Sequence, residues 1–519
     1  MALTRIPWKE RTRFVTAGQR PSVSEDSLLA VTKTRLAFAG LLICTAVVYF
    51  DRLGRASFSA SEAYSILAAN QPDLRHVVEA ALAYDPGKPP LYQVLLHWFV
   101  GRFGTGEFSA RTFSVLAGIV SVLALYKLAE KTFDSRVALL GASLWAFSPL
   151  AVMIAQWARM YSLLSALSVL VMLTLWRARH SPTPGNLAAF TLSVAASLYV
   201  HMAGLFCLVA ALAILLSDFL RGSRSAVPIA VAMLVALVLF IPFLGIEIAQ
   251  ARSLLYGHWL DWAGTPGSAS GWNLLLAIVL TGSTAATFLW SVSARSSKSD
   301  ALSFYLVWSL VPALAIVTVS LVFRPIIAQR YFVVSVPPAA ILLAYALILV
   351  PRGFRIAGCV SIFVVFFLAI SIFHLGRREP WRLIAIFISQ AGGDHQPIFF
   401  ESGSLVRVGP PREDGFPNGY FRVPFDLYFK GNAPRLTIDS SQPEAAREQI
   451  AAAAIRYGGA WLISGKPEPV AQNELPRKGF AISRMLADRE TILYHVVPPA
   501  TGKGTNLVRP GIGRQTAIP

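Results

Sequence analysis

The sequence predicts an all-α membrane domain that crosses the bilayer about eleven times, followed by a small α/β domain outside the membrane. Three observations predict this fold class. Of the 519 residues, 55% are hydrophobic and only 14% are charged, whereas an ordinary soluble domain has about 25% charged residues. The mean hydropathy of +0.55 is too high for one buried core, since a soluble chain would leave much of that apolar area in water. The apolar residues also fall in long runs, so a lipid bilayer is the expected surrounding of most of the chain.

The apolar runs have the length that crosses a bilayer, which takes about 20 predominantly apolar residues. The pair 186–201 and 202–219 is the least regular, and it is also consistent with a tight hairpin of two short spans broken near His201. The expected spans are residues 35–51, 111–128, 137–156, 160–177, 186–201, 202–219, 226–247, 271–293, 301–323, 331–350 and 356–375.

Basic residues set the expected orientation. A net charge of +18 would suggest a nucleic-acid partner in a soluble protein, but here Lys and Arg lie mostly in short connections between apolar runs, as cytoplasmic loops do. We therefore expect no nucleic-acid partner, a basic cytoplasmic segment at 1–34 and an extracytoplasmic C-terminal domain. The cations of the expected cytoplasmic loops are Lys127, Lys131, Arg136, Arg177, Arg179, Arg221, Arg224, Arg295, Lys298, Arg352 and Arg355.

The first outer connection, residues 52–110, is unusually long for a membrane domain that extends over 35–376. It contains an amphipathic stretch, Ser61 to Ala83, and then an apolar run, Pro89 to Phe103, that is too short to span the bilayer. We expect interfacial helices here. The side chains expected near the lipid headgroups are Tyr92, His97 and Trp98.

Residues 377–500 change in character, because the apolar runs shorten while Pro, Gly and charged residues return. A capping box, Ser441 to Glu444, predicts a helix that ends near Tyr457, where Gly458 and Gly459 follow. We expect a small α/β domain here and a disordered tail at 501–519. The expected strands are Pro397–Phe400, Ala460–Ser464 and Thr491–Val497.

Polar side chains cluster at the expected outer ends of the spans. Charges at helix ends are usually membrane anchors, but several on one face, with carboxylates among them, favour a site. Arg159, Arg330 and Lys88 would hold a phosphate at the lipid boundary, because Arg binds phosphate oxygens in pairs and Lys adds a point charge. Glu62 and Asp85 are candidates for a general base or for metal ligands.

Several short motifs lie on the predicted outer loops and span ends. They are Ser61-Glu62-Ala63-Tyr64-Ser65-Ile66, Asp85-x-x-Lys88-Pro89-Pro90-Leu91-Tyr92, Glu107-Phe108-Ser109-Ala110-Arg111, Ser148-Pro149, Gln156-x-x-Arg159-Met160-Tyr161 and Tyr199-Val200-His201. Together, and in this order, they resemble the bacterial GT-C membrane glycosyltransferases, in the superfamily of the protein O-mannosyltransferases and aminoarabinose transferases. The resemblance covers roughly residues 35–330.

The resemblance implies a sugar donor linked to a polyprenyl phosphate, a long first outer loop with interfacial helices and a bacterial inner (plasma) membrane location. It places Asp85 and Lys88 near the donor phosphate, and it matches Arg111 to the family's arginine at the start of the second span. Arg159 and Tyr161 match an arginine–tyrosine pair after the third span. The further candidates for substrate binding are His201, Arg330 and Tyr331.

Two positions depart from the family pattern. Members usually carry Asp-Glu where this chain has Ser61-Glu62, and often Gln-Glu where it has Gln156-Trp157. The missing aspartate is the expected base, and a serine cannot replace it without an activating partner. Either Glu62 or Asp85 has taken the role, or the chain is a poor or inactive catalyst.

The expected activity is transfer of a hexose or pentose from a polyprenyl-phosphate donor to a hydroxyl of a glycolipid, polysaccharide or protein acceptor. A lipid or solute transporter is the first alternative, although charges deep within the spans, typical of ion-coupled transport, are nearly absent. A non-catalytic scaffold for other envelope enzymes is the second. No cofactor is certain from the sequence, and a divalent metal, Mg²⁺ or Mn²⁺, is left open.

Overall fold

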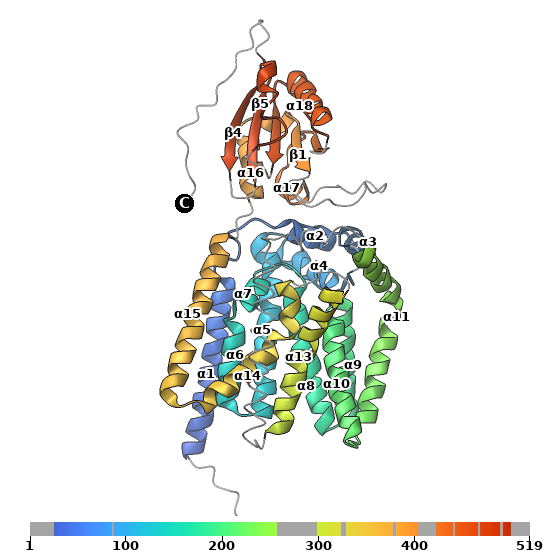
Figure 1. Cartoon of the computed structure of the whole chain (residues 1–519), viewed down its shortest axis with the longest axis vertical. Helices are drawn as coiled ribbons and strands as arrows, with labels where there is room; N and C mark the ends of the chain where they lie inside the picture. Colours follow the sequence, from blue (N-terminus) through green and yellow to red (C-terminus); the bar gives the residue numbers. More distant parts are fainter. Residues whose placement is uncertain are drawn as a thin grey trace, which may run out of the picture.

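The computed structural model describes residues 25–85, 88–256, 298–322, 328–376, 380–402, 422–439, 442–464, 468–487 and 491–499. These residues form a helical bundle with a sheet domain at one end (Figure 1). The helices of the bundle are α1 (Glu25–Phe50), α2 (Ala60–Ala69), α3 (Leu74–Tyr84), α4 (Leu91–Phe103), α5 (Glu107–Thr132), α6 (Ser135–Ala146), α7 (Pro149–Ala155), α8 (Tyr161–His180), α9 (Pro184–Val200), α10 (Gly204–Leu220), α11 (Ala226–Tyr256), α13 (Ser299–Val322), η2 (Gln329–Val334), α14 (Val336–Leu349) and α15 (Arg352–Gly376).

The long apolar helices make this a multi-pass membrane protein. Within the described residues, six helices are long and apolar enough to cross a bilayer, or seven if a bent pair counts as one span. The shorter helices α9, α10 and α14 also occupy predicted spans, with α9 and α10 separated at His201 as expected. The predicted span 271–293, the segment 1–24 and the tail 501–519 lie outside the described residues, so the total of about eleven spans stays a prediction.

Two predicted spans are not continuous helices. The span expected at 137–156 is broken between α6 and α7, which meet at an angle of 61°. Ser148 caps α7 through its side chain and Pro149 follows. Proline has no N–H to continue the helix that precedes it, so the chain turns here. The span expected at 331–350 starts as the 3₁₀ segment η2, and the α-helix begins only at Val336.

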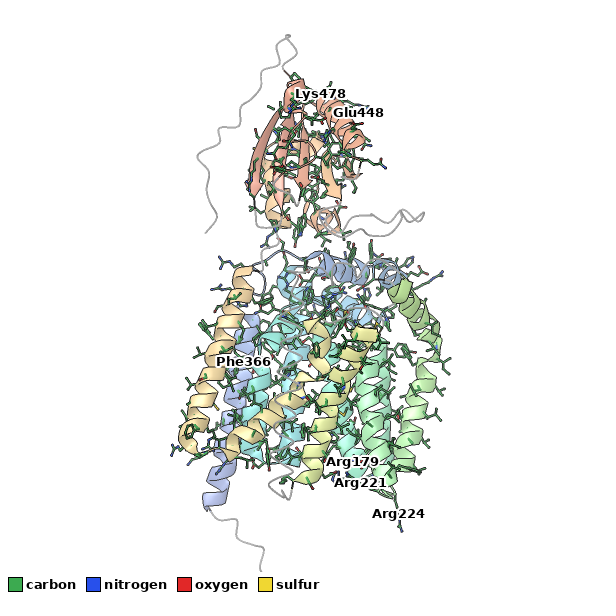
Figure 2. The ribbon with its side chains drawn as sticks, in the orientation of Figure 1. Arg179, Arg221, Arg224, Phe366, Glu448 and Lys478 are labelled. Atoms are coloured by element: carbon green, nitrogen blue, oxygen red, sulfur yellow. The ribbon has the colours of Figure 1, made fainter. Side chains whose placement is uncertain are left out.

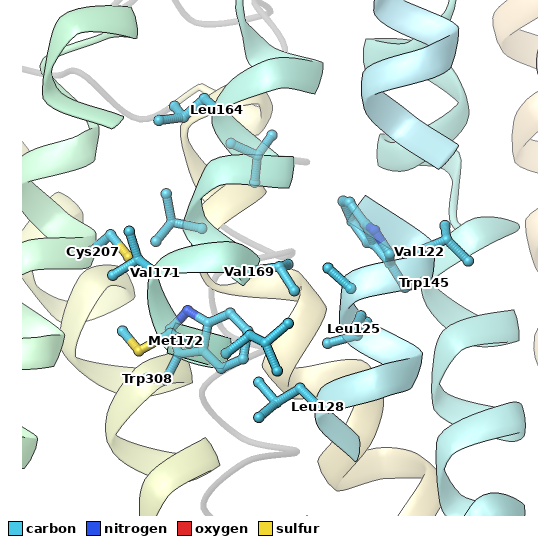
Figure 3. Close-up of a cluster of buried hydrophobic side chains, with 14 of the residues drawn as sticks. Val122, Leu125, Leu128, Trp145, Leu164, Val169, Val171, Met172, Cys207 and Trp308 are labelled. Atoms are coloured by element: carbon cyan, nitrogen blue, oxygen red, sulfur yellow. The ribbon is translucent and has the colours of Figure 1, made fainter. Parts of the chain in front are cut away.

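Small residues allow the helices of the bundle to approach closely. A Cβ on Gly118 of α5 would lie 2.9 Å from the ring of Tyr49 on α1, and one on Gly141 of α6 would collide with Ile341 of α14. Beside these contacts, large side chains from α5, α6, α8 and α13 fill the interior of the bundle (Figure 3), with Trp145 and Trp308 fully buried. The loops at the ends of the bundle are therefore connected to tightly packed helices.

Three helices form the connection between α1 and α5 and lie across one end of the bundle (Figure 1). The amphipathic stretch predicted over 61–83 is two helices, because Asp73 caps a new helix after α2 ends at Ala69. Trp98 on α4 is 68% exposed, as an interfacial side chain should be. The prediction for Tyr92 was wrong: its ring is fully buried and its hydroxyl lies 3.1 Å from Ser114 Oγ.

The sheet domain has a mixed five-stranded sheet in the order β2-β1-β3-β5-β4. Strand β1 is parallel to β2 and β3, whereas β5 is antiparallel to β3 and β4. The predicted small α/β domain thus has a sheet at its centre, although β2 and β4 were not predicted. Its elements are α16 (Trp381–Gln390), η3 (Gly393–His395), β1 (Ile398–Ser402), α17 (Arg422–Tyr428), β2 (Arg435–Asp439), α18 (Pro443–Tyr457), β3 (Ala460–Ser464), η4 (Pro476–Lys478), β4 (Ala481–Ala487) and β5 (Ile492–Val497).

Alternation along the strands gives the sheet two apolar faces. Phe399 and Leu462 pack with α18 on one face, while Phe400 and Ile463 pack with α16 and α17 on the other. Helix α18 ends at Tyr457, before Gly458 at φ 72°, as predicted. Its start differs from the prediction, because Gln442 is the N-cap and makes no side-chain hydrogen bond to the helix. The layer of α16 and α17 lies between the sheet and the bundle (Figure 1).

The charge pattern agrees with an oriented bundle. Arg179, Arg221 and Arg224 lie at the end of the bundle away from the sheet domain (Figure 2). The sheet domain and these expected cytoplasmic loops therefore face opposite ends of the spans. Which membrane side each end faces stays a prediction.

Candidate active site

Most of the predicted site residues meet at the end of the bundle that faces the sheet domain. They come from four places along the chain: the loop after α3, the connection from α7 to α8, the break between α9 and α10, and η2. His201 lies within electrostatic reach of charges from three of these places. The residues brought together are Asp85, Lys88, Arg159, Tyr161, His201, Arg330 and Tyr331.

Asp85 is the carboxylate at the centre of this site. One oxygen accepts a hydrogen bond from Arg159 Nη2 at 2.5 Å, and the other accepts from Lys88 Nζ. The Asp85 side chain is 15% exposed, so it is sheltered but reachable. Burial alone would raise the pKa of this carboxyl, but Arg159 and Lys88 outweigh burial and hold the pKa well below its ordinary value. Asp85 is therefore charged at neutral pH in the absence of a ligand.

Arg159 has hydrogen-bonding capacity to spare. Its Nη1 donates to the carbonyl of Ser61 at 2.9 Å and to Ser65 Oγ at 3.0 Å, and its Nη2 donates to Asp85. A guanidinium has five N–H donors, so two remain. One is on Nε, which is buried and has no hydrogen-bond partner within the described parts of the chain. Such a donor is costly to leave unfilled, which makes it a candidate for binding an anion.

His201 supplies a second unfilled donor. The break after α9 turns its Nδ1 onto the backbone N–H of Ala203, from which it accepts a hydrogen bond at 2.9 Å. A nitrogen that accepts carries no proton, so the proton of the neutral ring is on Nε2. This Nε2 is buried and lacks a partner among the residues that the structure describes. It can therefore donate to a ligand.

Aromatic rings form one side of the site. The ring of Tyr161, at the start of α8, lies 5.5 Å from that of His201 and 6.4 Å from that of Tyr331. The guanidinium of Arg330 lies over both tyrosine rings, at 5.9 Å from Tyr161 and 5.4 Å from Tyr331. The guanidinium is charged at neutral pH and its charge acts on His201, so Arg330 adds to the positive field of the site.

Glu62 and Arg111 lie in a second, closed ion pair. The Glu62 carboxylate accepts from Arg111 Nε at 2.8 Å and from Nη2 at 3.0 Å, and both side chains are 0% exposed. The N–H of Ala158, the N–H of Ser59 and the hydroxyl of Ser59 also donate to Glu62. These contacts complete a capping box at the start of α2. The Arg111 guanidinium makes its other hydrogen bonds to the carbonyls of Leu53, Ala56 and Ser57.

The two positions that depart from the family pattern lie at the start of α2 and between α7 and α8. The hydroxyl of Ser61 lies 3.3 Å from Ser59 Oγ, and only its backbone carbonyl contacts Arg159. Trp157 donates from its indole nitrogen to Ser59 Oγ at 3.1 Å. This hydrogen bond connects Trp157 to the N-cap residue of α2. Positions 61 and 157 therefore carry no carboxylate.

Ser65 stands in the first of the family motifs, but no role was expected for it, and the connections to the sheet domain were not expected. Ser65 follows Ser61 by one helical turn, which places both beside Arg159, so a helical reading of this stretch could have found it. Arg382 and Tyr428 contact the loop between α1 and α5, but nothing in their local sequence marks them.

The cluster does not suit a divalent metal. The described residues contain no group of three or more His, Cys, Asp or Glu side chains that could hold one. Asp85 is moreover flanked by Lys88 and Arg159, whose charges would repel a cation. The residues present here fit an anion instead.

Comparison with known proteins agrees with this architecture. The family described as dolichyl-phosphate-mannose-protein mannosyltransferase matches residues 87–246, a stretch that includes Lys88, Arg111, Arg159 and His201. A search of curated proteins gave no significant match to the sequence.

Solved structures match over most of the chain. ArnT from Cupriavidus metallidurans in the apo state has a TM-score of 0.56 at 14% identity, with 90% of this chain and 98% of that chain covered. ArnT bound to undecaprenyl phosphate gives the same TM-score and identity over 88% of this chain and 98% of that chain. The oligosaccharyltransferase of Archaeoglobus fulgidus in complex with Zn and sulfate has a TM-score of 0.51 at 14% identity, covering 88% and 72%. The resemblance to the GT-C fold, with its mannosyltransferase-like and aminoarabinose transferase-like members, is confirmed.

Proposed function

We propose that this GT-C fold protein is an inverting membrane glycosyltransferase. It would move a sugar from a polyprenyl-phosphate donor to an acceptor hydroxyl on the outer face of the inner membrane. The observation that carries the proposal is the pair of cations, Lys88 and Arg159, that converge on Asp85 beside unfilled buried donors of Arg159 and His201. The match to the mannosyltransferase family and the solved complex of ArnT with undecaprenyl phosphate support it.

The donor phosphate would bind where the cations meet. It would take the free Nε–H of Arg159 and the Nε2–H of His201, and share Lys88 with Asp85. Arg330, held over Tyr161 and Tyr331, would add a further positive charge. Charge-assisted hydrogen bonds of this kind are about twice as strong as neutral ones. The polyprenyl chain would remain in the bilayer beside the helices.

Asp85 is the base that the geometry favours. In the transfer step it would accept the proton of the acceptor hydroxyl while the hydroxyl oxygen forms a bond to the anomeric carbon of the sugar. The bond from that carbon to the phosphate oxygen breaks, and its electron pair leaves with polyprenyl phosphate. Attack opposite the leaving group inverts the anomeric configuration. Lys88 and Arg159 would stabilise the charge that grows on the phosphate.

The bound donor would also make Asp85 a better base. Without a ligand, two cations hold its carboxylate in the charged form and make it a weak proton acceptor. A phosphate that shares Lys88 and Arg159 withdraws part of this stabilisation and adds a negative charge nearby, and both effects raise a carboxyl pKa. A bound phosphate would not change Glu62 in this way, because hydrogen-bond donors of the protein enclose its carboxylate.

A transfer assay on the full chain in lipid nanodiscs tests the proposal. The protein receives radiolabelled polyprenyl-phosphate sugars and envelope glycolipid, polysaccharide or protein acceptors, and released polyprenyl phosphate is measured with labelled acceptor. We expect Asp85→Asn to lower the rate by about 10²-fold or more. Asp73→Asn is the matched control, because Asp73 is an exposed acid of the same loop whose capping role Asn can fill.

Two outcomes would count against the proposal. Full activity of the Asp85→Asn variant would remove Asp85 as the base. Absence of transfer from every donor by folded wild-type protein would reject the glycosyltransferase assignment and favour a transport or scaffold role. The placement of the site outside the cytoplasm is tested separately, since a tag on the C-terminus should be reached only from the extracytoplasmic side.

A further inference from the structure

Hydrogen bonds join the described part of the sheet domain to the bundle, beside the packing of Leu427 and Tyr428 against the bundle core. Tyr428, the last residue of α17, accepts a hydrogen bond from the backbone N–H of Phe58 at 2.7 Å. Its hydroxyl donates to Glu107 Oε1 at 2.9 Å. Arg382 of α16 donates to the same oxygen of Glu107 at 3.0 Å and to the carbonyl of Arg55 at 2.8 Å. All these partners lie in the connection between α1 and α5 or at the first residue of α5.

The contacted stretch, residues 53–59, has a second task. Its carbonyls at Leu53, Ala56 and Ser57 accept hydrogen bonds from the guanidinium of Arg111 at 2.8, 2.8 and 3.0 Å. We call residues 53–59 the strap. One side of the strap is bound to the sheet domain and the other side encloses Arg111.

From the strap, the contacts continue to the site. Arg111 holds Glu62 at the start of α2, and Glu62 accepts from the N–H of Ala158, the residue before Arg159. The same helix α2 supplies Ser61 and Ser65, which orient Arg159 Nη1. The position of α2 therefore sets the direction of the guanidinium that binds Asp85.

The hydroxyl of Tyr428 is suited to a fixed contact. Burial raises the pKa of Tyr428, so the hydroxyl keeps its proton and can always donate to Glu107. A neutral hydroxyl that accepts from one group and donates to another satisfies both partners at once. Loss of the hydroxyl would leave the Phe58 N–H without its acceptor and would release the middle of the strap.

We propose that Tyr428 is a positioning residue, through which the sheet domain fixes the strap and thereby orients Arg159 toward the donor phosphate. The inference rests on the proposed function, because it assigns the sheet domain a part in the same reaction. The sheet domain is then needed for catalysis even if it contributes no group that touches the sugar.

The test compares Tyr428→Phe with Tyr457→Phe in the full chain in nanodiscs. Tyr457 is on α18 of the same domain, which packs on the face of the sheet opposite α16 and α17, and it is 42% exposed, so it is a matched control. Hydrogen exchange of peptides covering 53–62 reports on the strap, and binding of undecaprenyl phosphate reports on the site without turnover. We expect about tenfold faster exchange in the strap, several-fold weaker lipid phosphate binding and about tenfold lower kcat for Tyr428→Phe. The acceptor KM and melting temperature should stay close to those of the control.

Glu107→Gln gives a second variant of the same contact. If both residues act through one hydrogen-bonded unit, the double variant should be no worse than the poorer single variant. Unchanged exchange in the strap, or faster exchange with unchanged binding and kcat, would overturn the inference and leave Tyr428 as a simple tether. Wild-type protein that binds lipid phosphate but transfers no sugar would reject the proposed function, while the binding comparison would still decide the role of Tyr428.

Discussion

Two carboxylate–arginine clusters lie at the same end of the bundle and share helix α2, yet their carboxylates differ in exposure. In the pair of Glu62 and Arg111, both side chains are 0% exposed. In the cluster of Asp85, Lys88 and Arg159, the carboxylate is 15% exposed. The same residue types therefore build a sealed cluster that organises the chain and an open cluster that can react.

Hydrogen-bond counting makes the difference concrete. All five N–H groups of Arg111 are used, two by Glu62 and three by carbonyls of the strap. Arg159 uses only three of its five within the part of the chain that the structure describes. A ligand that bound Arg111 would add no hydrogen bond, because every bond it formed would replace an existing one. At Arg159 it would fill donors that folding left empty.

The largest expected effect comes from breaking the sealed pair. Arg111→Gln would leave the buried Glu62 carboxylate without its counter-charge, which typically costs about 3–5 kcal/mol. We expect a marked fall in folded yield and in melting temperature, measured by fluorescence size-exclusion chromatography after heating in detergent.

The double variant Glu62→Gln with Arg111→Gln is the control for this prediction. It removes both charges and should be more stable than Arg111→Gln alone, because no unpaired charge remains. A single variant as stable as wild type would show that the pair does not hold the strap and α2 together.

The second effect concerns activity rather than stability. Arg159→Lys keeps the charge but loses the planar fork that reaches Ser61, Ser65 and Asp85 together. We expect about 10²-fold lower kcat with a melting temperature near that of wild type, measured in the transfer assay. Arg136→Lys, an exposed position at the opposite end of the bundle, should keep full activity. Retained activity of Arg159→Lys would mean that charge alone is sufficient and that the open donors are unused.

Much of the open cluster was predictable because each of its residues lies at the end of an apolar run. Asp85, Arg159, His201 and Arg330 come from distant segments, but the loop charges predicted that all of them lie at one membrane level. Strand positions such as 460–464 and the helix end at Tyr457 were likewise visible in local patterns. Periodicity and capping are local properties, so a single sequence shows them.

The sealed cluster was harder to predict, although part of its signal was present. Ser59 and Glu62 have the spacing of a capping box, which would have assigned Glu62 a structural role at the start of α2. The pairing of Glu62 with Arg111 across 49 positions carries no local signal. The same holds for Tyr428, which reaches Phe58 from 370 positions away in a short helix without a distinctive pattern. Long-range polar contacts depend on the tertiary fold, so only the structure reveals them.

The smallest expected effect is a difference between two pH profiles, and it probes how a ligand changes the open cluster. In the free protein, Arg159 and Lys88 hold the Asp85 pKa well below its ordinary value of about 3.9, so kcat/KM should stay flat as the pH falls from about 7 to 5. In the donor complex, the phosphate shares these cations and raises the Asp85 pKa. Protonation then removes the base at a higher pH than in the free protein, so the acid limb of kcat should lie at a higher pH than that of kcat/KM. The measurement is a pair of initial-rate profiles, one with saturating and one with limiting donor, and the acid limb of kcat should be absent from the residual activity of Asp85→Asn. An acid limb of equal midpoint in both profiles would show that bound phosphate does not draw Lys88 and Arg159 away from Asp85, and the open cluster would then be as fixed as the sealed one.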